Sequence, residues 1–221
     1  MTNNHNAATL AAAALLSLTL AVDALAQTFT DAASVRYRSL SASDGGEEVY
    51  LGSGDLGNPA NRVAQELDWY LNGLPNSFAF GMVRDSQGGA TMYSTALGEP
   101  LLTSSELVNS EALASANRIV ITMYNRDPLG SFDIPSFRIL ADGVVLVEDS
   151  LFATQPVQSW LWQGQGVCFG QMNNWEVDGV IQAFGPFSNS QEASKVEISL
   201  ISAGNWPENE CSDALMQDGF E

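Results

Sequence analysis

The sequence has little positive charge. Of its 221 residues only eight are Lys or Arg, whereas 26 are Asp or Glu, so the formal net charge is −18. Nucleic acids and anionic membranes bind basic surfaces, and a protein field of this sign repels both. The acids are scattered singly and in pairs, which is typical of a solvated acidic surface rather than a disordered tail. We therefore expect no nucleic-acid partner.

The sequence has no long apolar run beyond its first 26 residues. Residues 7–22 are apolar and uncharged, and Ala24 and Ala26 supply the small side chains of a signal-peptide cleavage site. The run is shorter than the roughly 18 residues of a membrane span. No Lys or Arg precedes it, in contrast to the usual layout of a signal peptide. We expect residues 1–26 to be a cleaved signal peptide, with an uncleaved anchor as the alternative, and no transmembrane segment in the mature chain.

Histidine is absent after this cleavage, because His5 is the only one. Ser-His-Asp and Cys-His catalysis are thereby excluded, as are zinc and copper sites built on imidazole. Lys195 is the only lysine, and Glu192 stands three residues before it, so a Ser-x-x-Lys arrangement is excluded too. Carboxylate chemistry and oxygen-bound metals remain. We expect no cofactor.

Cysteine occurs only at Cys168 and Cys211. An even count in an exported chain favours a disulfide bond. This bond would close the loop from residue 168 to residue 211, which is worth roughly 4 kcal/mol in the chain-entropy model. It would also attach the start of the C-terminal tail to the body of the protein.

Alternation of apolar and polar residues fills most of the mature chain, and this period of two predicts half-buried strands. Turn residues such as Asn72-Gly73 and Asp178-Gly179 separate many of these segments, and only residues 104–116 suit a short helix. We predict an all-β protein, an antiparallel β-sandwich or jelly roll of roughly ten or eleven strands with at most one short helix. It forms a single domain over residues 28–206, followed by an acidic tail, 207–221. Strands are expected near 34–40, 47–51, 62–71, 76–83, 90–97, 118–124, 136–140, 143–149, 158–162, 179–184 and 195–201.

Gly52–Gly57 matches G-x-G-x-x-G, the pattern of a dinucleotide-binding turn. Such a turn leads into a helix, whereas the residues that follow alternate as a strand. We therefore predict that these glycines shape a loop between two strands.

Two carboxylate pairs have i,i+2 spacing: Glu66 with Asp68, and Glu176 with Asp178. Both members of such a pair lie on one face of a strand. Glycosidases use two carboxylates roughly 5–9.5 Å apart, so a carboxylate-based glycan hydrolase or lyase is one hypothesis. The polar face of any exposed strand gives the same spacing, and this is the interpretation we favour.

Asn174, Glu176 and Asp178 also imitate the opening of a calcium loop. The bidentate Glu that should follow is missing, because Gly185 stands in its place. We expect no metal here and predict a β-turn that leads into the next strand.

Three tryptophans form a further candidate. Trp160 and Trp162 would share one strand face, and Trp175 follows a short loop later. If exposed, they could stack on the sugar rings of an extracellular glycan; if buried, they belong to the core of the sandwich.

Much of the chain resembles a family of bacterial exported proteins. It is similar to the "choice-of-anchor" β-sandwich domains, which occur with interchangeable C-terminal sorting signals. The resemblance implies a fold without established catalytic residues. The segments that carry it are YLGSGDLG (50–57), LDWYLNGLPNSFAFGMVRD (67–85), GGATMYSTALG (88–98), RIVITMYNRD (118–127), SFRILADGVVLVEDSLFA (136–153), DGVIQAFGPF (178–187) and KVEISLI (195–201).

The C-terminal segment DALMQDGFE, residues 213–221, looks like a short "DGFE" ending found on many exported bacterial proteins. Met216 replaces the aromatic residue that this ending often has. The resemblance implies a sorting tail outside the fold. Its matching residues include Asp213, Asp218, Gly219, Phe220 and Glu221.

These features predict an exported, secreted or surface-bound protein of the bacterial periplasm or exterior. We expect a non-enzymatic β-sandwich module for cell-surface, matrix or polymer contact, with an extracellular glycan or surface protein as partner. The alternatives are a carbohydrate-binding module, with or without calcium, and the carboxylate-dependent polysaccharide-active enzyme.

Overall fold

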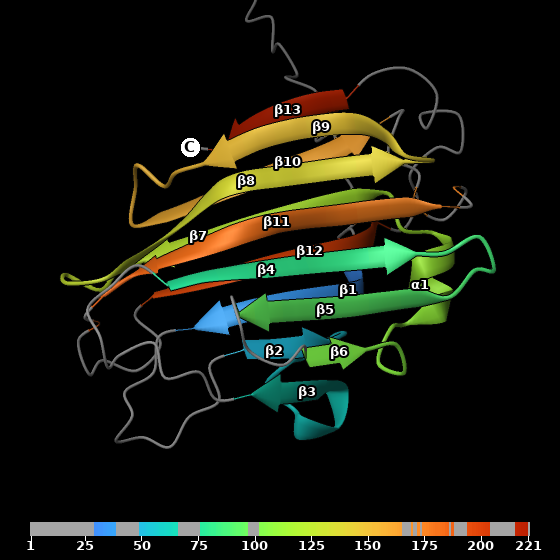
Figure 1. Cartoon of the computed structure of the whole chain (residues 1–221), viewed down its shortest axis with the longest axis horizontal. Coiled ribbons are helices and arrows are strands. Elements are labelled where there is room, and N and C mark those ends of the chain that lie inside the picture. The colour runs from blue at the N-terminus through green and yellow to red at the C-terminus, as the bar shows by residue number, and fades with distance from the viewer. Residues whose placement is uncertain are drawn as a thin grey trace, which may run out of the picture.

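The computed structural model forms a sandwich of two antiparallel β-sheets, with one short helix among the described residues (Figure 1). The structure describes residues 29–38, 49–65, 76–96, 102–164, 169, 172, 174–185, 187, 194–203 and 215–220. The predicted all-β sandwich is therefore confirmed. No helix in these ranges is long and apolar enough to cross a membrane.

The larger sheet has seven strands in the order β13-β10-β7-β12-β1-β2-β3. Its strands come from distant parts of the chain, because β12 lies between β7 and β1. The bounds are β1 Phe29–Arg38, β2 Val49–Gly52, β3 Arg62–Gln65, β7 Arg118–Asn125, β10 Val157–Gly164, β12 Ser194–Ala203 and β13 Leu215–Phe220.

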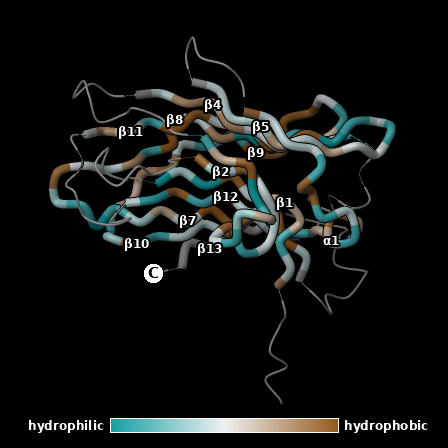
Figure 2. The backbone as a smooth tube through the Cα atoms, turned by 90° about the horizontal axis from the view of Figure 1, so that it is seen from below, coloured by the Kyte–Doolittle hydropathy of each residue, from teal (hydrophilic) through white to brown (hydrophobic). Residues whose placement is uncertain are grey.

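The smaller sheet has six strands in the order β6-β5-β4-β11-β8-β9. The two sheets lie in separate layers when the molecule is turned by 90° (Figure 2). The bounds are β4 Asn76–Arg84, β5 Ala90–Ala96, β6 Leu102–Ser104, β8 Ser131–Ala141, β9 Val144–Leu151 and β11 Trp175–Phe184; the helix α1 spans Ser110–Ala114 and a 3-10 turn spans Pro59–Asn61.

The core lies between the sheets and follows the alternation of the sequence. On β7, Ile119 and Ile121 are fully buried, whereas the intervening Val120 is only partly buried. The rings of Phe137 on β8 and Trp162 on β10 meet across the layers, with 4.6 Å between their centroids. Burying a side chain of this size contributes roughly 1.5–3 kcal/mol, so inward positions of this kind hold the sheets together.

The tryptophans are part of this core. Trp160, Trp162 and Trp175 are 7%, 1% and 2% exposed. The indole N–H of Trp175 donates to the carbonyl oxygen of Phe169 at 3.0 Å, which satisfies its polar atom inside the protein. The hypothesis of a sugar-stacking platform is therefore wrong, and the core interpretation is confirmed.

The turn predicted at Asp178-Gly179 is also wrong, because both residues lie within β11. Gly179 is needed there for a close approach rather than for a bend. A Cβ atom at this position would lie 2.6 Å from the ring of Phe80 and 2.6 Å from the carbonyl oxygen of Ser136. Since Glu176 and Asp178 both lie within β11 and not in a loop, the calcium-loop interpretation fails with the turn.

The C-terminal tail differs from the prediction as well. Residues 215–220 form β13, which pairs antiparallel with β10 from Ser159↔Phe220 to Gly164↔Leu215. The expectation that the tail lies outside the sandwich is wrong for this segment. Without β13, β10 would be the edge of the larger sheet and would leave backbone N–H and C=O groups unpaired.

Several predicted features fall outside the described residues: the signal peptide, Glu66, Asp68, Cys168, Cys211, Asp213 and Glu221. The signal peptide, the disulfide bond and the first carboxylate pair therefore stay predictions.

Candidate functional site

The second carboxylate pair lies on the outer face of the six-stranded sheet. Asp178 accepts two hydrogen bonds from Arg138 on β8, with Nε–Oδ1 at 2.9 Å and Nη2–Oδ2 at 2.5 Å. Glu176 accepts a hydrogen bond from the hydroxyl of Tyr93 on β5, at 3.3 Å. Each carboxylate therefore has its own donor from a different strand.

Tyr93 reaches Glu176 because a glycine lies between them. Gly81 on β4 is the register partner of both Tyr93 and Asp178. A Cβ atom on Gly81 would lie 2.2 Å from Cζ of Tyr93, so the ring crosses β4 in the space that this side chain would fill. The pKa of Tyr93 is raised to about 12, first by burial and then by the charges of Glu176 and Asp178. Tyr93 therefore keeps its proton and acts as a donor.

This arrangement favours the structural interpretation of the pair over the catalytic one. Both oxygens of Asp178 are occupied by one guanidinium, and charge-assisted pairs of this bidentate kind are strong and fixed in geometry. A proton-transferring carboxyl needs an oxygen free to face a substrate. No group of three or more His, Cys, Asp or Glu that could hold a metal ion occurs in the described part of the chain.

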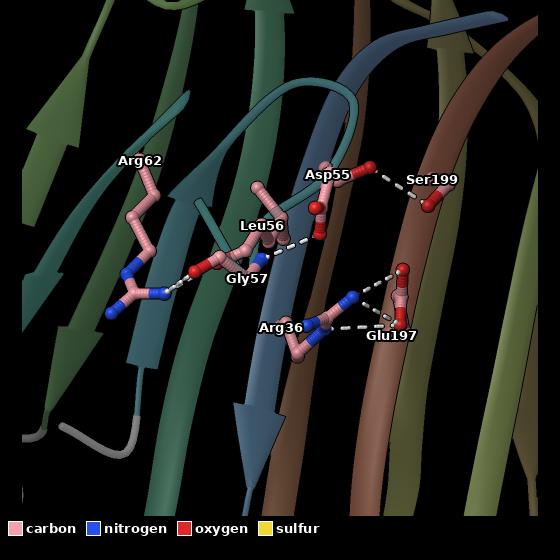
Figure 3. Close-up of polar contacts among 8 residues, drawn as sticks. Arg36, Asp55, Leu56, Gly57, Arg62, Glu197 and Ser199 are labelled. Atoms are coloured by element: carbon pink, nitrogen blue, oxygen red, sulfur yellow. Dashed lines mark hydrogen bonds and ion pairs between the residues drawn. The ribbon is translucent and has the colours of Figure 1, made fainter. Parts of the chain in front are cut away.

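The outer face of the seven-stranded sheet carries a second cluster, which the sequence analysis missed. The loop of residues 53–61 returns from β2 to β3 and folds back onto this face (Figure 3). Asp55 accepts from the N–H of Gly57 at 2.8 Å, and Arg62 donates to the carbonyl oxygens of Leu56 and Gly57 at 2.6 and 3.1 Å. Leu56 is fully buried. The predicted inter-strand loop at Gly52–Gly57 is thus confirmed.

Tyr50 lies beside this loop and is held between two arginines. The guanidinium carbons of Arg38 and Arg62 lie 4.5 and 4.3 Å from the centroid of its ring. Tyr50 is only 1% exposed. The loop and the two arginines therefore close this part of the sheet face.

An ion pair occupies the middle of the face. Arg36 on β1 binds Glu197 on β12 through Nε and Nη2 at 3.0 and 3.1 Å, as Figure 3 shows. Ser34 and Ser199, the next outward residues on these strands, share a hydrogen bond of 2.8 Å. Asp31 lies nearby, and its pKa is raised to about 6, first by burial and then by the charge of Glu197, while Arg36 acts in the opposite direction.

Tyr124 on β7 forms the far part of the cluster. Nζ of Lys195 lies 4.5 Å from the centroid of its ring, and the guanidinium carbon of Arg126 lies 5.5 Å from it. Arg126 is exposed, and Lys195 and Tyr124 are partly exposed. This part of the face is therefore open to solvent, unlike the part around Tyr50.

We call these side chains the cationic band. All except Arg126, which directly follows β7, come from neighbouring strands in the order β7-β12-β1-β2-β3. Arg38, Lys195 and Tyr124 share one row of the register. No local sequence pattern predicts the band, because its members are up to 159 residues apart (36 to 195). The band consists of Arg36, Arg38, Tyr50, Arg62, Tyr124, Arg126 and Lys195, and thus contains five of the eight cations of the chain.

A polar pocket of about 360 Å³ lies at the end of the sandwich where β3 and β6 approach each other. Its lining includes hydroxyl groups of Thr91, Thr103 and Ser104 together with Arg62 and Glu106. Such a lining suits a small polar group, and it adjoins the closed end of the cationic band through Arg62.

The sequence matches no known family model and no curated protein at a significant level. Function therefore has to be inferred from the geometry of the sheet faces.

Proposed function

We propose that the protein is a non-enzymatic, exported β-sandwich module that contacts a polymer of the cell surface or its matrix. The observation that carries the proposal is the cationic band on the outer face of the seven-stranded sheet. In its open part, Tyr124 and Lys195 lie on the neighbouring strands β7 and β12 with the exposed Arg126 beside them, whereas the part around Tyr50 is covered by the loop of residues 53–61. A solvent-exposed strand face of this kind suits an extended polymer better than a small metabolite, which usually binds in a concave pocket. Residues 1–26 support export, because they have the layout of a signal peptide.

The rival enzyme hypothesis has less support. Of its four candidate carboxylates, Asp178 is paired with Arg138 and Glu176 is bonded to Tyr93. The interior tryptophans leave no aromatic wall from this set for a sugar groove. The enzyme hypothesis therefore depends on Glu66 and Asp68.

A carbohydrate-binding module is the second candidate, and the hydroxyl-lined pocket between β3 and β6 favours it. Hydroxyl, guanidinium and carboxylate groups together can bind the hydroxyls at the end of a glycan chain. The two candidates differ in where the polymer lies, at the pocket or along the sheet face.

A binding and turnover assay on the mature protein tests the proposal. Sedimentation with insoluble or immobilised polymers, neutral and acidic, should show retention of the protein, and reducing-sugar assays should show no release from any of them. Release of sugar would contradict the proposal, and its loss in the double variant Glu66→Gln with Asp68→Asn would establish the enzyme.

Thr103→Val tests the pocket: a loss of glycan binding in this variant alone would favour the carbohydrate-binding module.

A further inference from the structure

The cations of this chain are unevenly distributed. The net charge is −18, yet six of the eight cations lie on the outer face of one sheet: the five of the cationic band and Arg118, which is buried at the other end of β7. The other two are Arg84 and Arg138, and Arg138 is neutralised by Asp178 on the opposite sheet. A surface of this kind keeps an overall repulsion of anions and offers one local site where an anion is attracted.

Only one half of the band is available to a ligand. Around Tyr50, the band is covered by the loop of residues 53–61, and Arg36 is already paired with Glu197. Around Tyr124, Lys195 and Arg126 form no ion pair with any residue in the described ranges. The open half therefore has two cations that no carboxylate in those ranges compensates.

The nearest acid in the sequence does not compensate Arg126. Asp127 is 7% exposed, and its Oδ1 accepts hydrogen bonds from the N–H groups of Leu129 and Gly130, at 2.9 and 3.3 Å. This carboxylate is thus used to hold the turn between β7 and β8. Arg126, one residue earlier, stays exposed beside Tyr124.

Tyr124 positions the two cations. A cation within about 6 Å of an aromatic centroid is attracted to the ring, and both Lys195 and Arg126 meet this condition. Arg38 is the register partner of Lys195 on the next strand, so a third cation stands in the same row. Side chains that are already ordered lose less entropy when a ligand binds.

On this basis we propose that Tyr124, Lys195 and Arg126 form a binding site for the carboxylate groups of an acidic polysaccharide of the uronate type. This inference rests on the proposed function and names the class of polymer. Sugar-borne carboxylates accept charge-assisted hydrogen bonds from both cations, and the phenol hydroxyl can bond the ring hydroxyls beside them.

The net charge of the protein favours a polyanion with widely spaced charges over one with closely spaced charges. Duplex DNA carries one negative charge per roughly 1.7 Å and is bound by proteins that neutralise many phosphates at once. The two cations beside Tyr124 cannot do so against a protein charge of −18. A polymer with one carboxylate per sugar pairs with these two cations locally, and at about 0.1 M salt charges beyond about 10 Å are screened.

The test uses the mature full-length protein and immobilised polygalacturonate as the probe. We expect binding at about 0.15 M salt, where the overall negative charge of the protein is screened, and loss of binding near 1 M, where the local ion pairs are screened as well. Binding to a fully methyl-esterified form of the same polymer should be weaker or absent. Lys195→Gln with Arg126→Gln removes both charges and should weaken binding by roughly tenfold, as expected for the loss of two exposed charge-assisted contacts. Lys195→Arg with Arg126→Lys is the matched control, and it should retain most of the binding.

The inference would be overturned by absence of binding to polygalacturonate at about 0.15 M salt or by equal binding of the charge-removed variant and the parent. Equal binding to the esterified polymer, or tighter binding to duplex DNA or anionic vesicles through the same residues, would overturn it too. If the charge-removed variant does not fold, as judged by its melting temperature, Lys195→Gln alone provides the comparison. Binding to neutral polymers that none of these variants changes would overturn the inference and leave the proposed function standing.

Discussion

Gly81 shows how a single residue decides which side chains meet on the smaller sheet. Tyr93 on β5 and Glu176 on β11 are separated by one strand, β4, which carries Gly81. Any side chain at position 81 would fill the space through which the phenol reaches the carboxylate. The glycine therefore exists for packing, although glycine in a strand interior is otherwise unfavourable.

We predict that Gly81→Ala destabilises the protein by about 1–3 kcal/mol, because the new methyl group overlaps the ring of Tyr93. Urea denaturation measures the change. In a Tyr93→Ala background the same substitution should cost much less, since the ring is gone. An equal cost in both backgrounds would show that the overlap with Tyr93 is not the cause.

Asp31 links stability to pH. Its pKa is raised from 3.8 to about 6 in the folded protein, first by burial and then by Glu197. The folded state therefore binds the proton more tightly than the unfolded state, and stability falls as pH rises from about 3.8 to about 6. The destabilisation caused by ionised Asp31 is therefore complete above about pH 6 and absent well below pH 3.8.

Asp31→Asn removes the penalty, so we predict that this variant is more stable than the parent at pH 7 and equal to it near pH 4. The difference at pH 7 should be about 1 kcal/mol, less than the full shift implies, because the side chain is partly exposed and solvent screens its charge. Free energies of unfolding across the pH range measure this. A difference that does not depend on pH would show that Asp31 keeps an ordinary pKa.

At the scale of elements, the alternation of apolar and polar residues predicted those strands well that have one buried face and one exposed face. Residues 118–124 and 195–201 were expected as strands, and β7 and β12 cover them. Alternation failed to predict β6, which has only three residues. It also failed at Asp178-Gly179, because the sequence does not distinguish a glycine required for close packing from a glycine required for a turn. It also missed β13, where the Asp218-Gly219 pair resembles a turn.

The pairing of β13 with β10 changes what truncation of the tail should do. Ending the chain after Cys211 removes the whole of β13 and exposes the edge of β10, whose inward Trp160 and Trp162 belong to the core. Net contributions of about 0.5–1.5 kcal/mol per hydrogen bond add up over a six-residue pairing. We predict a loss of roughly 2 kcal/mol or more and faster hydrogen exchange at the backbone amides of β10.

Thermal melting and hydrogen exchange of the truncated and full-length proteins test this prediction. A chain shortened only by Glu221 is the control, since it keeps all of β13, and it should behave as the full-length protein does. Unchanged stability together with protected β10 amides in the truncated protein would mean that β13 contributes nothing to the fold. The tail would then be free for the sorting role that its resemblance implies.

At the scale of the whole molecule, residues 1–26 predict export, which stays a prediction, and composition restricts the possible chemistry, but neither locates the site. The net charge is a sum and carries no information on where the cations lie. Arg38 and Lys195 become neighbours only because β12 inserts between β7 and β1, a pairing between the two ends of the chain. No local pattern in the sequence encodes such an order, whereas each strand of the band could be predicted by itself.

The predicted Cys168–Cys211 disulfide also acts at this scale, because it would tie the segment before β13 to the segment between β10 and β11. The bond would reduce the conformational entropy of the unfolded chain, and so the entropy lost when β13 pairs with β10 would be smaller.

We predict that peptide mapping of exported material without reductant recovers the two cysteines in one linked fragment. Reduction should lower stability by roughly 2–4 kcal/mol and increase exchange at β10, as truncation of the tail does. The variant with both cysteines replaced by serine is the control for reductant effects and should match the reduced protein. Two thiols that react freely with an alkylating reagent in natively exported protein would refute the bond, and β13 would then depend on its pairing with β10 alone.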